Sequence, residues 1–230
     1  MCNEKNAYTL ILASASPRRK EFLEHLNIPF EIKTMSIKEE TDCTLPDEIV
    51  LDLAKKKGIA VFNELQRLKD QKEKNSNFAD SFFPLIVAAD TLVFLGKEQL
   101  GRPRDALDAK EMLKKLSGKQ HFVYTGVYIV CFDIEKNMQR ERSFYCKTEV
   151  DFAHITEDFL EEYIKSGESM DKAGAYGIQG SALSFISGIK GSYSNVVGFP
   201  LYEFVVQLKD FLGCRDDNEG EWRKKFKRTK

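Results

Sequence analysis

Two hydroxyl groups and two guanidinium groups are concentrated near the start of the chain, in the segment Ser14-Ala-Ser-Pro-Arg-Arg19. Ser16 followed by Pro17 is typical of a helix start, because Ser is a good N-cap and Pro at the first helical position loses no hydrogen bond. The free N–H groups of such a helix end would lie beside Arg18 and Arg19, whose planar guanidinium groups match phosphate oxygens. The segment therefore predicts an anion site, with two solvated first-turn arginines as the alternative.

A lone acid interrupts the most apolar stretch of the chain. Pro84-Leu-Ile-Val-Ala-Ala89 predicts a buried strand that runs directly into Asp90 and Thr91, and apolar residues resume at 92–94. Burying an ionised carboxylate is costly unless a metal, a lysine or a water to be activated accompanies it. Asp90 is therefore a candidate catalytic residue, with a structural aspartate capped by backbone N–H groups in a turn as the alternative.

Three successive lysines, Lys55, Lys56 and Lys57, lie within a predicted helix that begins at Pro46. Successive side chains of a helix point about 100° apart. We therefore expect only one of the three to face a cleft, while the other two face solvent.

A glycine-rich segment, Asp171-Lys-Ala-Gly-Ala-Tyr-Gly-Ile-Gln-Gly180, has three glycines in ten residues and no regular apolar period. Glycine at this density lets a backbone approach a ligand closely. It is equally typical of a plain tight loop. The sequence leaves both interpretations open.

The elements that must position these residues are those of an α/β chain. Helical patterns recur at about residues 17–26, 46–68, 106–116, 156–166 and 197–212. Strand patterns lie at residues 10–13, 29–35, 84–89, 122–132, 143–152 and 183–189. The segments 122–132 and 143–152 predict a long antiparallel hairpin. Residues 66–81 are polar and weakly periodic, which favours a surface loop in the middle of this stretch. Pro200 is expected in the first turn of the last helix.

The overall composition excludes several classes of partner. The chain has 230 residues, of which 42% are hydrophobic and 31% charged, and its net charge is −1, so no overall field attracts nucleic acid or a membrane surface. No apolar run approaches the ~20 residues of a membrane helix. We therefore expect a cytoplasmic protein with no nucleic-acid or membrane partner.

The cysteine spacing and the ends of the chain bear on its organisation. Five widely separated cysteines without a C-x-x-C spacing disfavour a disulfide framework and a zinc site. The length suits one domain over residues 1–230, with a core of about residues 8–212. The basic segment at 213–230 is expected to be a flexible tail.

Several of these motifs together resemble the Maf family of nucleoside triphosphate pyrophosphatases. They are, in chain order, Ser14–Arg19, Ala88-Ala-Asp-Thr91, Arg102-Pro-Arg-Asp105, Leu116-Ser-Gly118, Asp171–Gly180, and Gly191-Ser-Tyr followed by Val197-Gly-Phe-Pro-Leu201. The resemblance implies a Maf/inosine-triphosphatase-like α/β fold, with a long twisted mixed sheet and two lobes flanking a nucleotide cleft. It also implies hydrolysis of a nucleoside triphosphate to the monophosphate and pyrophosphate by a homodimer that uses a divalent cation.

The resemblance also implies roles for individual residues. The implied substrate-binding residues are Ser14, Ser16, Arg18, Arg19, Lys57, Thr91, Arg102 and Gln179. Asp90 would be the catalytic residue, as general base or water positioner, and would hold the metal together with Glu39. Mg²⁺ is the expected ion and Mn²⁺ the alternative, because phosphates and carboxylates are hard oxygen ligands. Arg102 replaces the Lys of many relatives, which keeps the charge but changes its shape.

Three of these positions bear on the base. Arg18, Thr91 and Gln179 are similar to the set found in the family members that prefer dTTP and UTP. A Gln amide can pair with the acceptor and donor edge of uracil or thymine. The alternatives are the same reaction on 7-methyl-GTP or another modified nucleotide, and a nucleotide-binding regulator of cell division with little turnover.

Overall fold

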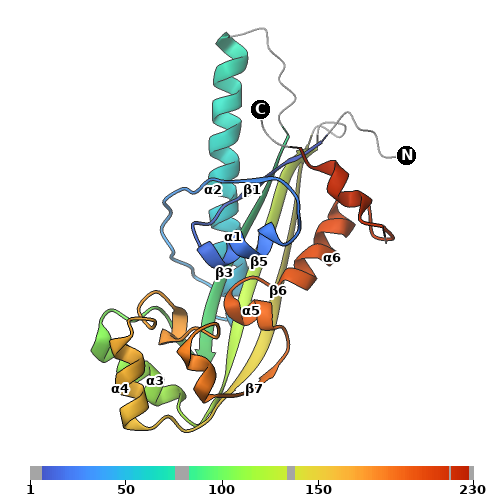
Figure 1. Ribbon diagram of the computed structural model, residues 1–230. Coiled ribbons are helices and arrows are strands. Elements are labelled where there is room, and N and C mark those ends of the chain that lie inside the picture. The colour runs from blue at the N-terminus through green and yellow to red at the C-terminus, as the bar shows by residue number, and fades with distance from the viewer. Residues whose placement is uncertain (1–6, 76–82, 134–137, 218, 228–230) are drawn as a thin grey trace.

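The computed structural model describes residues 7–75, 83–133, 138–217 and 219–227, and within them it has one seven-stranded mixed sheet flanked by helices (Figure 1). The strands are β1 (Thr9–Leu12), β2 (Phe30–Ile32), β3 (Pro84–Leu95), β4 (Glu98–Leu100), β5 (Gln120–Asp133), β6 (Met138–Phe152) and β7 (Ile186–Lys190). The helices are α1 (Pro17–Glu24), α2 (Pro46–Asn75), α3 (Ala106–Leu116), α4 (Glu157–Lys165), α5 (Tyr193–Val197) and α6 (Leu201–Phe211), with short 3₁₀ turns at Ala173–Ala175, Ser181–Phe185 and Glu221–Lys225.

The strand order is β2-β1-β3-β5-β6-β7, and β4 pairs with the far end of β3. β2, β1 and β3 are parallel, whereas β3, β5, β6 and β7 are joined by antiparallel pairing. The long strands β3, β5 and β6 run the length of the molecule, with α2 along one face of the sheet and α1 and α6 along the other (Figure 1). The helices α3 and α4 pack at the end of the long strands that lies away from α1 and α6, where they form a second lobe. The expected α/β fold with two lobes is confirmed.

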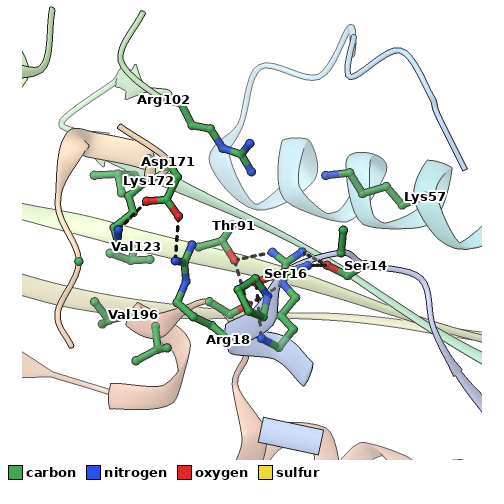
Figure 2. Close-up of a pocket in the computed structure, with 18 of the residues that line it drawn as sticks. Ser14, Ser16, Arg18, Lys57, Thr91, Arg102, Val123, Asp171, Lys172 and Val196 are labelled. Carbon is green, nitrogen blue, oxygen red and sulfur yellow. Dashed lines mark hydrogen bonds and ion pairs between the residues drawn. The ribbon is translucent and has the colours of Figure 1, made fainter. Parts of the chain in front are cut away.

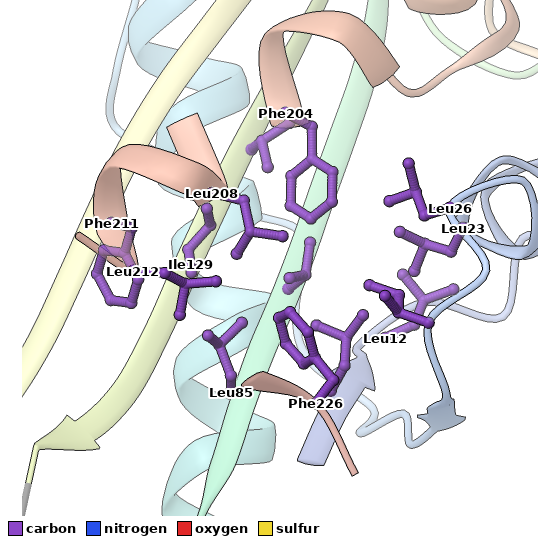
Figure 3. Close-up of a cluster of buried hydrophobic side chains, with 14 of the residues drawn as sticks. Leu12, Leu23, Leu26, Leu85, Ile129, Phe204, Leu208, Phe211, Leu212 and Phe226 are labelled. Carbon is purple, nitrogen blue, oxygen red and sulfur yellow. The ribbon is translucent and has the colours of Figure 1, made fainter. Parts of the chain in front are cut away.

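The main core lies between the sheet and the helices α1 and α6. Figure 3 shows side chains from both helices, and from the turn after α1, meeting those of the strands, among them Leu23, Leu26, Phe204, Leu208, Leu85 and Ile129. These side chains are buried, so they are held by the hydrophobic effect and by close packing. This core fixes the start of α1, and therefore the predicted anion segment, against the end of β1.

Side chains of β3 alternate between the two faces of the sheet, as the geometry of a strand requires. Ile86 and Ala88 pack in the cluster under α2, whereas Leu85 and Val87 pack in the core under α6. Continuing this alternation places Asp90 on the α2 face and Thr91 on the α6 face. Neither position carries an apolar residue. The two residues lie between the hydrophobic clusters at one end of the sheet and those at its other end.

An opening in the sheet lies beside these two residues. The pairing of β1 with β3 ends at Val87, whose carbonyl accepts a hydrogen bond from Ala13 N at 2.8 Å. Pairing of β4 with β3 begins only at Val93. Between these points no described strand pairs with this edge of β3, so a molecule that lies in the opening can reach side chains on both faces of the sheet.

A predicted loop differs from the structure because of local chain chemistry. The expectation of a surface loop in the middle of residues 66–81 is wrong as far as Asn75, because α2 continues to that residue. Gln, Arg, Lys and Glu are good helix formers, and the Arg67–Glu64 pair adds an i,i+3 contact. Residues 76–81 of that prediction lie outside the described residues.

The expected single helix over 197–212 is two helices, α5 and α6. The chain turns at Gly198, whose φ of 123° suits glycine, and Pro200 caps α6 instead of lying in its first turn. In the other lobe, the strand expected over 183–189 begins at Ile186, after the 3₁₀ turn Ser181–Phe185.

The described part of the C-terminal segment also differs from the flexible tail that the sequence predicts. Trp222 and Phe226 are buried in the core beneath α6. Tyr8 exchanges backbone hydrogen bonds with this segment, donating to Lys225 O at 2.7 Å and accepting from Lys227 N at 3.0 Å. Burial of two large aromatic rings outweighs the basic character of the segment, so it is part of the fold.

No helix among the described residues is long and apolar enough to cross a membrane.

Candidate active site

The start of α1 has the cap that the sequence predicts. Ser16 is the N-cap, its Oγ accepts a hydrogen bond from Arg19 N at 3.5 Å, and Pro17 follows at the first helical position. Ser14 Oγ accepts from Ser16 N at 3.2 Å and from Arg19 Nη1 at 3.1 Å. The two hydroxyl groups therefore order the loop and the guanidinium that the loop carries.

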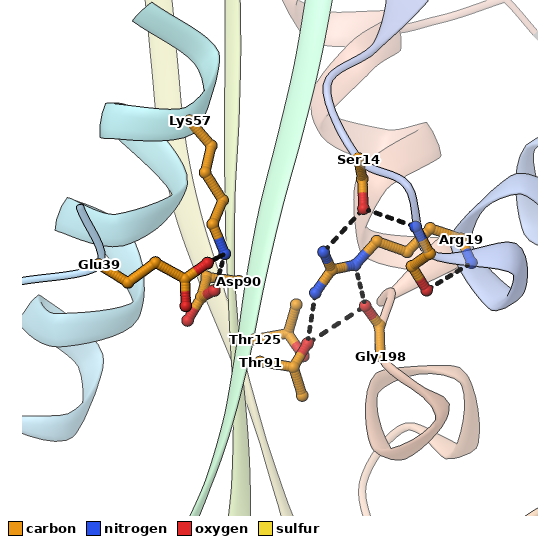
Figure 4. A network of polar contacts seen from close by, with 9 residues as sticks. Ser14, Arg19, Glu39, Lys57, Asp90, Thr91, Thr125 and Gly198 are labelled. Atoms are coloured by element: carbon orange, nitrogen blue, oxygen red, sulfur yellow. Dashed lines mark hydrogen bonds and ion pairs between the residues drawn. The ribbon is translucent and has the colours of Figure 1, made fainter. Parts of the chain in front are cut away.

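Arg19 is fixed by acceptors from three separate segments (Figure 4). Besides Ser14, its guanidinium donates to Gly198 O at 3.0 Å and to Thr91 Oγ1 at 3.1 Å. Burial lowers the pKa of Arg19, while the charge of Asp90 raises it. Because three of its five N–H groups bind protein oxygens, Arg19 is a fixed positive charge that joins the α1 loop, β3 and the turn between α5 and α6.

Thr91 belongs to this network on the α6 face. Its Oγ1 lies 2.9 Å from Thr125 Oγ1 and 3.2 Å from Gly198 O, and Thr125 Oγ1 lies 3.3 Å from Asn195 O. Sequence reasoning missed Thr125 and Gly198. Thr125 lies opposite Thr91 through the β3–β5 register, which no short motif in the sequence reveals.

Lys57 and two carboxylates form a second cluster on the α2 face. Lys57 Nζ lies 2.5 Å from Asp90 Oδ1 and 2.8 Å from Glu39 Oε1 (Figure 4). The hydrogen bond from Lys57 lowers the pKa of Glu39. Asp90 is therefore a buried acid accompanied by a lysine, which is one of the three partners that the sequence argument required.

The neighbouring lysines confirm the helical argument. Lys55 pairs with Glu141 at 2.7 Å and Lys56 with Asp52 at 2.6 Å, both at exposed positions away from the cleft. Only Lys57 of the three lines the cleft, as expected.

A glycine that the sequence analysis overlooked lets α2 approach the sheet at this level. Gly126 lies opposite Asp90 on β5, and a Cβ at this position would be 2.3 Å from Val50 O of α2. A side chain at this position would push α2 away from the sheet. Lys57 lies two turns further along the same helix, so the close approach of α2 at Gly126 helps to bring the Lys57 ammonium within hydrogen-bond distance of Asp90.

The donor chemistry of Asp90 and Glu39 fits a hard divalent cation. Asp90 Oδ2 is buried and has no hydrogen-bond partner among the described residues, although Oδ1 is bound to Lys57. Carboxylate oxygens are ligands of Mg²⁺ and Mn²⁺. Within the described part of the chain no group of three or more His, Cys, Asp or Glu residues could hold a metal. Two carboxylates therefore fit an ion that takes its remaining ligands from water and substrate.

One cleft of about 700 Å³ brings together nine of the ten predicted site residues. They are Ser14, Ser16, Arg18, Arg19, Glu39, Lys57, Thr91, Arg102 and Gln179. Asp90 is not part of the cleft lining and lies next to it, in contact with Lys57. The side chains of Lys57 and Arg102 point toward each other across the cleft (Figure 2). Arg18 Nη1 lies 3.2 Å from Asp171 Oδ2 of the glycine-rich segment, so the two lobes also meet in an ion pair.

A buried histidine beneath the glycine-rich segment predicts a pH dependence of stability. His121 Nε2 lies 2.7 Å from Tyr176 Oη, and burial lowers the pKa of His121 to about 4. In the unfolded chain this pKa is about 6.5, so between these values the unfolded state binds more protons and stability falls as pH falls. We expect a loss of about 3 kcal/mol in the free energy of unfolding between pH 6.5 and pH 4 from this residue.

Urea unfolding at pH 7, 5.5 and 4.5 measures this effect, with His121→Asn as the comparison. The variant should be less stable at pH 7 and lose less stability on acidification than the parent. Equal losses in the two proteins would show that His121 does not titrate on unfolding.

Comparison with known proteins agrees with this geometry. A family model described as Maf-like protein matches residues 9–211. The chain is 41% identical over 208 residues to a dTTP/UTP pyrophosphatase of Bacillus cereus strain ATCC 10987, covering 90% of this chain and 92% of that protein. It is 41% identical over 203 residues to a dTTP/UTP pyrophosphatase of Bacillus thuringiensis subsp. konkukian strain 97-27, covering 88% and 95%. The chain belongs to the Maf family.

Proposed function

We propose that this chain is a nucleoside triphosphate pyrophosphatase that hydrolyses dTTP and UTP to the monophosphate and pyrophosphate. The observation that carries the proposal is the opening beside β3. There, the Lys57–Asp90–Glu39 cluster on one face and the Arg19–Thr91 network on the other border a single cleft. The names of the relatives support the choice of substrates.

The cationic groups suit a triphosphate. Arg18 and Arg19 of α1, Lys57 of α2 and Arg102 before α3 reach the cleft from three different segments. Their charges would bind phosphate oxygens and stabilise negative charge that develops during phosphoryl transfer. Ser14 and Ser16 add hydroxyl groups at the N-terminus of α1. Because Arg19 is already held by three protein acceptors, it would need little reorganisation when substrate binds.

Asp90 is positioned to bind the attacking water. Its buried Oδ2 has no hydrogen-bond partner among the described residues, so it can accept a hydrogen bond from a water molecule in line with the α-phosphate. At pH 7 an ionised Asp is a weak base, so orientation of the water should contribute more than proton abstraction. A divalent cation held by Asp90 and Glu39, with Mg²⁺ favoured over Mn²⁺, would neutralise phosphate charge and activate water.

The base would lie against the glycine-rich segment, where Gln179 is exposed to the cleft. Its amide offers a donor and an acceptor, which complement the acceptor and donor edge of uracil and thymine.

We also propose that the chain is one Maf domain, acts as a cytoplasmic homodimer, and has no nucleic-acid or membrane partner. Family membership supports the single domain, and the net charge of −1 supports the absence of nucleic acid.

Pyrophosphate release from a panel of nucleoside triphosphates tests the proposal. The panel contains the canonical ribo- and deoxyribonucleotides and 7-methyl-GTP, each with Mg²⁺ or Mn²⁺. We expect dTTP and UTP to give the highest kcat/KM. Turnover confined to 7-methyl-GTP would contradict the proposed base specificity, and nucleotide binding without pyrophosphate release would contradict the proposed enzyme.

A further inference from the structure

Gln179 lies in a tight turn whose geometry is set from outside the cleft. Gly180 N donates to Gly177 O at 3.1 Å, which closes a turn over residues 177–180 with Gln179 in its third position. Within this turn Ile178 is buried, whereas Gln179 is exposed and lines the cleft. The direction of the Gln179 amide therefore depends on how the two ends of this turn are held.

Each end of the turn is held by a side chain that does not line the cleft. At the first end, Gly177 N donates to Tyr163 Oη of α4 at 3.2 Å. Just past the other end, the Glu168 carboxylate accepts from Ser181 N at 3.1 Å and from Ser181 Oγ at 2.8 Å. The two anchored positions, Gly177 and Ser181, are thus separated by three residues, and the anchoring side chains come from α4 and from the turn after it.

The first anchor is itself rigid. Tyr163 is 1% exposed, and its ring packs edge-on against Phe185 with a centroid separation of 5.5 Å. It belongs to the buried cluster that joins α3, α4 and the end of the sheet. A hydroxyl held in such a core has little freedom to follow the turn, so it fixes the position of Gly177 N.

Two glycines of the segment lie directly against neighbouring side chains. A Cβ on Gly180 would lie 1.9 Å from Glu168 Oε2, and a Cβ on Gly177 would lie 2.5 Å from Lys172 Cε. Lys172 Nζ in turn donates to Glu168 O at 2.6 Å. These contacts of Gly177 and Gly180 fit a tight loop, which is one of the two interpretations that the sequence left open.

We propose that Tyr163 and Glu168 are positioning residues that set the base selectivity of this enzyme by fixing the turn that carries Gln179. The inference rests on the proposed dTTP/UTP hydrolysis, and it explains how one exposed amide could discriminate between pyrimidines. UTP and CTP have nearly the same shape but present opposite hydrogen-bonding groups at position 4 of the ring. An amide rejects the wrong pattern only when it cannot rotate or shift to accommodate it, so selectivity depends on the anchors.

The test compares kcat and KM for UTP and CTP in the parent, Tyr163→Phe and Ser181→Ala. Tyr163→Phe removes only the hydroxyl that accepts from Gly177, and Ser181→Ala removes one of the two bonds to Glu168 at an exposed position. We expect Tyr163→Phe to lower the UTP/CTP ratio of kcat/KM by about tenfold, chiefly through KM for UTP, with kcat for UTP within about twofold of the parent. Ser181→Ala should lower the ratio by about threefold.

A double-mutant cycle separates positioning from a general structural effect. If Tyr163 acts through Gln179, then Tyr163→Phe should leave the UTP/CTP ratio unchanged in a Gln179→Ala background. Tyr202→Phe, at a 76% exposed position on α6, makes the same chemical change away from the cleft and should keep the parent ratio. Thermal unfolding of each variant shows whether the fold is retained.

The outcomes distinguish this inference from the function on which it rests. A parent that hydrolyses UTP, with single variants that keep its UTP/CTP ratio, overturns the positioning role and leaves the proposed function intact. An equal fall of the ratio with and without Gln179 also overturns it, because Tyr163 would then act elsewhere. A parent that does not hydrolyse UTP overturns both the function and the inference.

Discussion

Replacing Asp90 by Asn is expected to lower kcat for pyrophosphate release by about 10³-fold, which is the scale of losing both a general base and metal-assisted water activation. Asn has nearly the same size and keeps an oxygen for Lys57, which lies 2.5 Å from Asp90 Oδ1. It removes the negative charge beside Lys57 and Arg19, and it replaces the buried Oδ2 acceptor with an NH₂ donor. Initial rates with dTTP and UTP in Mg²⁺ measure the effect.

Asp52→Asn is the matched control for this variant. Asp52 also pairs with a lysine of α2, because Lys56 Nζ lies 2.6 Å away, but it does not line the cleft. The control should retain the parent rate. A titration with Mn²⁺, followed by its paramagnetic resonance signal, should show weaker binding in Asp90→Asn than in Asp52→Asn. An Asp90→Asn enzyme with the parent kcat would remove Asp90 from the mechanism.

The predictable parts of the site are those that depend on near neighbours in the sequence. Ser16 and Pro17 specify the start of α1 by their own chemistry, and the structure has that cap. The prediction that only one of the three lysines of α2 faces the cleft is correct, because the backbone fixes the rotation between successive side chains of a helix. An acid in an apolar strand also indicated that a metal, a lysine or a water accompanies Asp90, and the structure has Lys57 at 2.5 Å.

The arrangement of the site around β3 could not be predicted in the same way. Adjacent residues of a strand face opposite sides, so Asp90 contacts Lys57 and Thr91 contacts Arg19, although the two are neighbours in the sequence. Their access to one cleft depends on where β1 ends and β4 begins beside β3. Strand register is set by long-range packing, which also explains why the opposing Thr125 was missed.

Long-range packing also accounts for the difference at the C-terminal segment. Its basic composition predicts a solvated tail, because a short stretch of sequence shows its own charge but not the distant residues that it contacts. Trp222 and Phe226 nevertheless join the core formed by α1, α6 and the sheet. Arg223 Nε donates to Leu26 O at 2.9 Å, so even the charged residues of this segment bind distant backbone. Partners such as Tyr8 and Leu26 lie near the other end of the chain, beyond the reach of any local pattern.

Replacing Arg19 by Lys is expected to lower kcat/KM by about 10²-fold and the free energy of unfolding by about 3 kcal/mol, although the charge is conserved. The guanidinium binds Ser14, Thr91 and Gly198 in three different directions. A lysine ammonium on a flexible stem cannot reproduce this planar fork, and the buried Gly198 carbonyl would lose a charged donor. Steady-state kinetics and urea unfolding measure the two losses.

The comparison with Arg67→Lys separates the geometry of Arg19 from its charge. Arg67 makes an exposed pair with Glu64 on α2, where exchange of arginine for lysine should change neither activity nor stability measurably. Arg19 differs because its three acceptors belong to the α1 loop, to β3 and to the turn between α5 and α6. If Arg19→Lys instead kept the parent kcat/KM, a positive charge alone would suffice at this position. The phosphate-binding geometry would then depend on Arg18, Lys57 and Arg102, which reach the cleft without Arg19.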